Sequence, residues 1–139
     1  MMWKEMYRIG VDKVDAQHQE LFQRVEDFLL AIKGAGPWEE KLVKVKDTMA
    51  FMQDYVVEHF RDEEEYQRAI GYPGYDRHCR THEEFKAEVN KCAEKFAANG
   101  YTEDLAQEFA GKLMTWLIYH VAMDDQKIGQ YVRQGGQQA

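Results

Sequence analysis

Five histidines and two carboxylates at helical spacing are the residues of this sequence best suited to chemistry. The chain has five histidines. A single histidine on an apolar helix face is usually a core residue with one hydrogen bond, but burying five imidazoles without partners is costly. One metal site would give all of them a partner. Every one falls on the apolar stripe of a predicted helix: His18, His59, His78, His82 and His120.

The spacing of these residues supports a metal site. His78 and His82 are four residues apart, so both project from one helix face and can hold the same ion. His59 and Glu63 have the same spacing, with one nitrogen and one oxygen donor. Glu63 belongs to an acidic run, residues 62–65, whose other three members we interpret as a solvated surface patch. Glu63 alone keeps phase with His59, and a carboxylate buried there needs a cation.

The last helix offers two candidates for a seventh donor. Regular geometry places Asp124 on the face of His120, because the two are four residues apart. The later apolar residues, Ile128 and Val132, instead count back to Asp125 in steps of three and four. The stripe therefore slips by one residue, which a π-bulge accommodates. We predict a locally widened helix with Asp125 facing inward, and a regular α-helix with Asp124 inward would contradict this.

The donor set indicates the kind of metal. Imidazole and carboxylate donors suit iron, manganese or zinc better than copper(I). Seven donors exceed what one ion takes, so two ions bridged by the carboxylates are expected. The Glu-x-x-His motif of carboxylate-rich di-iron bundles is absent from the sequence. Structural zinc does not fit, because its sites are four-coordinate and rich in cysteine.

Three breaks divide the chain into four long segments. They are Pro37 after a glycine-rich stretch, the Gly-Tyr-Pro-Gly run at 71–74, and Asn99-Gly100 followed by Thr102. Each segment has apolar residues at helical spacing, and none shows the alternation of a strand. Short links between long amphipathic helices favour antiparallel neighbours. The sequence therefore predicts an all-α fold, an up-down-up-down antiparallel four-helix bundle with an N-terminal arm.

One domain accounts for the whole chain of 139 residues. We expect an arm at 1–11 that packs on the bundle through Trp3 and Tyr7, a bundle over about 12–133, and a frayed tail at 134–139. Cys79 and Cys92 are thirteen residues apart in one predicted helix. That separation is about 20 Å, beyond the reach of a disulfide, so we expect free thiols.

Charge and hydropathy exclude several classes of function. A net charge of −7 argues against a nucleic-acid or anionic-membrane partner. No apolar run is long enough to span a bilayer, so we expect no membrane insertion. The first ten residues lack the apolar stretch of a signal peptide. These observations predict a cytoplasmic protein, and we expect a monomer.

Several blocks of the sequence resemble the hemerythrin family. The family's opening motif, D-x-Q-H-x-x-L-F, occurs at residues 15–22. H-F-x-x-E-E follows at 59–64, Y-P precedes H-x-x-x-H at 78–82, and W-L-x-x-H-V-x-x-x-D spans 116–125. The blocks come in the family's order and fill all seven ligand positions. The resemblance covers residues from about 3 to 130.

The resemblance implies a cofactor and a role for each residue. Two iron ions with a bridging oxo or hydroxo group would be held by the seven metal ligands. One ion would take three histidines (His78, His82, His120) and the other two (His18, His59), with Glu63 and Asp125 bridging. The ion with two histidines would keep an open position for molecular oxygen. The oxygen pocket implied by position is lined by Phe60, Trp116, Leu117 and Val121.

The function implied is reversible binding of molecular oxygen for storage or delivery. No catalytic residue beyond the metal ligands stands on the apolar stripes, so we expect a carrier and not an enzyme. An unidentified oxygen-accepting protein is a possible partner. The alternatives are an oxygen or redox sensor acting through a separate partner, a di-iron peroxidase or oxidase including nitric-oxide chemistry, and an iron buffer.

Overall fold

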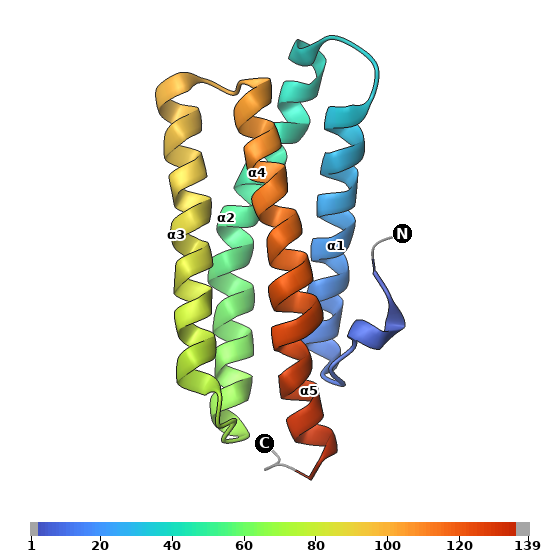
Figure 1. Ribbon diagram of the computed structural model, residues 1–139, viewed down its shortest axis with the longest axis vertical. Coiled ribbons are helices and arrows are strands. Elements are labelled where there is room, and N and C mark those ends of the chain that lie inside the picture. The colour runs from blue at the N-terminus through green and yellow to red at the C-terminus, as the bar shows by residue number, and fades with distance from the viewer. Residues whose placement is uncertain (1–2, 136–139) are drawn as a thin grey trace.

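The computed structural model describes residues 3–135 and contains, over that range, only helices and their connections (Figure 1). The first three long helices are α1 (Asp12–Lys33), α2 (Trp38–Ala69) and α3 (Tyr75–Asn99). The fourth rod is continuous and comprises α4 (Glu103–Trp116), the π-helical η2 (Leu117–Asp124) and α5 (Asp125–Arg133). α2 contacts α1 and α3, and α4 contacts the same two helices. The predicted antiparallel four-helix bundle is confirmed.

The helix ends lie where the sequence places its breaks. Pro37 immediately precedes the first residue of α2, where its fixed backbone angle suits a helix start. Gly100 ends α3 with φ +84°, a left-handed conformation that favours glycine. The Thr102 hydroxyl accepts a hydrogen bond from the Leu105 N–H (3.2 Å) and so caps α4. Short loops at all three breaks hold neighbouring helices side by side.

The N-terminal arm packs against the start of α1 through one short 3-10 turn, η1 (Glu5–Tyr7). Trp3 and Tyr7 both contact Phe22, each with ring centroids 5.4 Å apart, which confirms the predicted contact of the arm. Residues 1–2 of the predicted arm and 136–139 of the predicted tail lie outside the described residues.

The carboxylate of Asp15 fastens the arm to the bundle. It is buried and accepts the backbone N–H groups of Ile9 (2.8 Å) and Gly10 (3.2 Å). Two charge-assisted hydrogen bonds of this kind stabilise the end of the arm against the first turn of α1. The arm thereby covers one end of the bundle, where Ile9 is itself buried.

Two apolar clusters fill the interior and leave a polar layer between them. The larger cluster runs through all four rods and contains Phe28, Met52, Phe96 and Phe109 among its buried members. The smaller one lies toward the other end of the bundle and consists of Ile9, Val14, Ile70 and Ile128. The histidines lie between these clusters along the helices, so water is kept away from them on both sides.

The cysteines and the hydropathy of the helices agree with the sequence predictions. Cys79 and Cys92 are both free thiols, as predicted. Among the helices of residues 3–135, none has the length and apolar character needed to cross a bilayer.

Candidate metal centre

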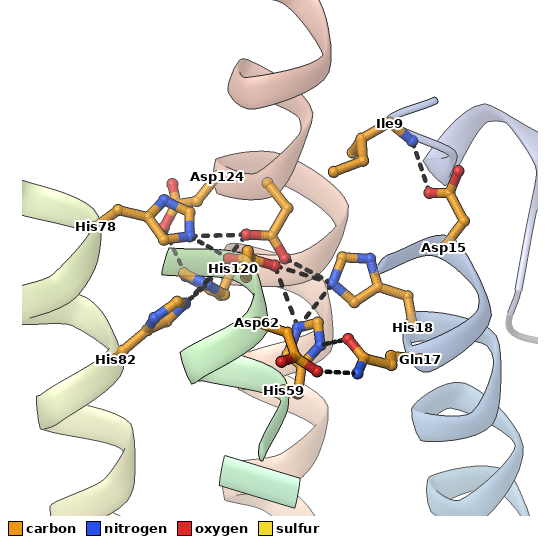
Figure 2. A network of polar contacts seen from close by, with 12 residues as sticks. Ile9, Asp15, Gln17, His18, His59, Asp62, His78, His82, His120 and Asp124 are labelled. Carbon is orange, nitrogen blue, oxygen red and sulfur yellow. Dashed lines mark hydrogen bonds and ion pairs between the residues drawn. The ribbon is translucent and has the colours of Figure 1, made fainter. Parts of the chain in front are cut away.

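The structure brings the seven predicted metal donors together in one layer across the bundle (Figure 2). The layer takes side chains from α1, α2, α3, η2 and α5, so it depends on the packing of all four rods. No donor is more than 6% exposed. These donors are His18, His59, Glu63, His78, His82, His120 and Asp125.

The donors form two overlapping groups that share both carboxylates. In one group three histidines, His78, His82 and His120, join Glu63 and Asp125; in the other His18 and His59 join the same pair. Within each group one donor atom per residue lies within 4.8 Å of every other. This is the arrangement expected of two ions bridged by carboxylates.

Each carboxylate presents one oxygen to each group. Oε1 of Glu63 lies 2.7 Å from His78 Nε2 and 3.1 Å from His82 Nε2. Its other oxygen, Oε2, lies 3.1 Å from His59 Nε2. Asp125 is divided in the same way, with Oδ1 2.9 Å from His78 Nε2 and Oδ2 3.1 Å from His18 Nε2. The two oxygens of one carboxylate can therefore serve two different ions.

The widened helix predicted after His120 is confirmed. η2 is π-helical, and the Asp125 N–H donates to the carbonyl of His120, five residues back. The extra residue in this turn keeps Asp125 in phase with His120. As a result the Asp125 side chain is fully buried, whereas that of Asp124 is 39% exposed. A regular helix would have exchanged the positions of the two aspartates.

A chain of hydrogen bonds fixes the tautomer of His59. The Gln17 amide nitrogen donates to Asp62 Oδ2 (2.9 Å), and Asp62 also pairs with Lys13 (3.2 Å). The Gln17 oxygen is then free to accept from His59 Nδ1 (2.6 Å), so Nδ1 carries the hydrogen. His59 Nε2, which lies 3.1 Å from Glu63 Oε2, consequently keeps its lone pair free for a metal ion.

Two further carboxylates orient histidines of the three-histidine group. Glu64 Oε2 accepts from His82 Nδ1 (2.7 Å), and Asp124 Oδ2 lies 3.3 Å from His120 Nδ1. The Nε2 atoms of His82 and His120 then face each other at 3.2 Å. When both imidazoles carry their hydrogen on Nδ1, two lone pairs meet beside carboxylate oxygens, and only a cation between them makes this favourable. The donor set therefore fits a metal pair.

These outer partners were largely missed by the sequence interpretation. The prediction of a solvated patch is wrong for Asp62 and Glu64, whose side chains are only 12% and 21% exposed and bind Gln17 and His82. Neither residue is in phase with the apolar stripe, and each instead contacts a residue of a neighbouring helix. Only Asp124 had a sequence signal, its four-residue spacing from His120.

Comparison with known proteins agrees with this geometry. Residues 9–132 match the family model described as Hemerythrin HHE cation binding domain. The chain belongs to the hemerythrin family. It is 29% identical to a bacteriohemerythrin of Stenotrophomonas maltophilia (96% of this chain, 82% of that protein). It is 32% identical to a bacteriohemerythrin of Campylobacter jejuni (86% of each) and 26% identical to a myohemerythrin of Theromyzon tessulatum (90% and 88%).

Hemerythrins hold a non-haem di-iron centre, and the buried cluster of this chain can hold such a metal pair. Without metal, the two carboxylates compensate the histidines electrostatically. Burial lowers the pKa of His18, but hydrogen bonds and charge from Asp125 and Glu63 outweigh it and raise that pKa to about 9. The same balance raises the pKa of His78 to about 10, whereas burial prevails at His59 and lowers its pKa. Metal binding must therefore displace protons from this hemerythrin.

The residues expected to line the oxygen pocket are all buried in this hemerythrin. Phe60 stacks on His82 with ring centroids 3.9 Å apart, and Trp116 stacks on His120 at 3.8 Å. Phe60 also lies 5.8 Å from the His59 ring. The two aromatic rings thus cover mainly the three-histidine group. Leu117 and Val121 are each 1% exposed and belong to the larger apolar cluster.

Proposed function

We propose that this chain binds molecular oxygen reversibly at a pair of iron ions, for oxygen storage or delivery. The observation that carries the proposal is the overlap of two buried donor groups at Glu63 and Asp125. We assign His78, His82 and His120 to one ion, His18 and His59 to the other, and both carboxylates to the two together. The iron pair supplies the electrons with which oxygen is held.

The difference in donor number supports a single oxygen position. One group offers five protein donors and the other four. An ion held by His18, His59 and the two carboxylates would therefore have one protein donor fewer than the ion held by three histidines, and that side would be able to accept oxygen without displacing a side chain.

The surroundings favour release of oxygen over its reduction. The apolar clusters close the layer at both of its ends along the bundle axis, and this limits the supply of protons from water. Tyr55, whose ring stacks on His59 with centroids 4.7 Å apart, has a buried hydroxyl. Burial and then the charges of Glu63 and Asp125 raise the pKa of Tyr55, so its hydroxyl retains its proton. We further expect the chain to act as a cytoplasmic monomer that delivers oxygen to a separate protein.

The test is a visible absorption spectrum of the reduced, iron-loaded protein cycled between argon and air, with iron counted per chain. We expect two irons per chain and a charge-transfer band that appears in air and disappears under argon over several cycles. An irreversible change at the first exposure to air would refute reversible binding and favour a redox sensor or a peroxidase or oxidase. More than two irons per chain would favour an iron buffer.

A further inference from the structure

A cavity of about 360 Å³ between α1 and α2 leads from the surface toward the two-histidine group. We call it the α1–α2 cavity. Gln17 and His59 line its inner part, and these two residues are joined by the hydrogen bond described above. Its outer part is lined by three carboxylates, from Glu20 on α1 and from Asp54 and Glu58 on α2. The four-residue spacing of Asp54 and Glu58 places both on one face of α2.

The three carboxylates carry charge that no other described residue compensates. All are exposed, and none has a hydrogen bond or ion pair with any residue of 3–135. Arg24 lies over the Phe51 ring on the cavity wall (4.5 Å to the centroid) but forms no ion pair with any of the three. The opening of the α1–α2 cavity therefore has three unpaired carboxylates and a net negative charge.

The larger groove between α3 and α4 differs in this respect. Its volume is about 880 Å³ and it also contains acidic residues, but most of them have partners. Glu88 pairs with Lys112 (2.6 Å) and Glu108 with Lys95 (3.0 Å). Asp124 in the same groove contacts His120 Nδ1 (3.3 Å), so of its four carboxylates only Glu84 is unpaired among the described residues, whereas all three carboxylates of the α1–α2 cavity are unpaired.

Tyr55 connects the cavity to the metal centre. Tyr55 lines the α1–α2 cavity, and only 7% of its surface is exposed. Its hydroxyl has no hydrogen-bond partner among the described residues. Its ring stacks on the ring of His59, with centroids 4.7 Å apart, so Tyr55 lies against both the cavity and a donor of the centre. An unpartnered buried hydroxyl is costly, and a passing cation would give its oxygen a partner.

We propose that ferrous iron reaches the buried centre through the α1–α2 cavity, held first by its three carboxylates and then passing Tyr55 to His59. The inference rests on the proposed function, since it assumes that iron is the resident metal. Oxygen donors of this kind suit hard divalent cations. The centre itself is closed to solvent, so an ion must pass between helices, and a negative opening raises the local cation concentration there.

The test compares two triple variants with the same change of charge. The cavity variant is Glu20→Gln, Asp54→Asn and Glu58→Gln. The control variant is Asp47→Asn, Glu84→Gln and Glu94→Gln, three exposed carboxylates outside the cavity that lack ion pairs in the described chain. Iron is removed from each full-length protein, helix content is checked by circular dichroism, and anaerobic uptake of Fe²⁺ is timed by tryptophan fluorescence and by iron counted per chain.

We expect the cavity variant to take up iron about tenfold more slowly than the parent at low ionic strength, with two irons per chain at the end. The difference should shrink as salt is raised, because the carboxylates are exposed. Tyr55→Phe should slow uptake at every salt concentration, since it removes no charge. Equal rates for cavity and control variants would overturn the proposal. Failure of the parent to hold two irons would refute the proposed function instead.

A second measurement uses the iron-loaded protein and does not depend on folding without metal. Mn²⁺ is titrated into it, and free Mn²⁺ is followed by electron paramagnetic resonance. We expect one weakly bound Mn²⁺ per chain in the parent and in the control variant, and none in the cavity variant. Equal Mn²⁺ binding by the cavity variant and the parent would overturn the role of the carboxylates.

Discussion

Replacing Gln17 with leucine should weaken iron binding on the two-histidine side alone. Leucine has a similar size but cannot accept the hydrogen of His59 Nδ1, which Gln17 now accepts at 2.6 Å. Asp62 keeps its ion pair with Lys13 (3.2 Å), so the surface end of the hydrogen-bond chain survives. His59 then loses the partner that fixes its tautomer and ring orientation. Loss of such an outer partner typically lowers metal affinity about 10- to 100-fold, or about 1.4 to 2.7 kcal/mol.

Anaerobic titration with Fe²⁺ against a competing chelator would measure this loss. We expect two binding steps, of which only the weaker one moves in Gln17→Leu, because the histidines of the other group contact neither Gln17 nor Asp62 in the described structure. Gln23→Leu is the matched control. Gln23 lies on the same helix and also donates to an aspartate, Asp27, at 2.9 Å, but it touches no histidine. Unchanged affinity in Gln17→Leu, or equal weakening of both steps, would refute the reasoning.

Three further predictions follow from the same contacts. Asp15→Ala removes two charge-assisted hydrogen bonds to the arm and should lower the free energy of unfolding by about 3 kcal/mol. In calorimetry the unfolding midpoint of the iron-loaded protein should fall by about 10 °C, and an unchanged midpoint would contradict the anchoring role. Asp125→Ala should abolish binding of the second iron, whereas Asp124→Ala should keep two irons with about tenfold lower affinity, as iron counting and titration would reveal. The metal-free chain should be less stable near pH 10 than near pH 6.5. The pKa values of His18 and His78 are raised in the fold to about 9 and about 10, so protonation of these histidines stabilises the fold fully below pH 6.5, and this stabilisation is lost as the pH rises through the two raised pKa values. An unfolding midpoint that rises from pH 6.5 to pH 10 would contradict the prediction.

The bundle and the position of the donor layer could be predicted from the sequence because both depend on periodicity. Apolar residues at helical spacing define which face of each helix is buried, and the histidines share that face. The widened turn could also be predicted from the sequence, since the apolar stripe resumes one residue late at Ile128. The π-helical hydrogen bond from the Asp125 N–H to the His120 carbonyl is the structural form of that slip.

Except for that of Asp124 with His120, the outer hydrogen bonds could not be predicted, because they join residues that are distant in the sequence and out of phase with the core. Gln17 binds His59, 42 residues away, and Glu64 binds His82, 18 residues away. Such pairs depend on how far two helices are rotated against each other, which no single-helix pattern reports. Glu64 has the same residue type and local surroundings as the exposed Glu65, and only the tertiary packing separates them.

The side chains that hydrogen-bond to the histidines differ in charge between the two sides of the centre. On the three-histidine side, His82 and His120 have the carboxylates of Glu64 and Asp124 as partners. On the other side, His59 has the neutral amide of Gln17, and Nδ1 of His18 has no partner among the described residues. A carboxylate partner raises the basicity of an imidazole more than an amide does, so the three-histidine side is the stronger donor set and better stabilises an ion of higher charge. The two-histidine side, which we propose as the side that accepts oxygen, therefore has both fewer and weaker protein donors, so a ligand bound there would not have to compete with strongly held protein groups.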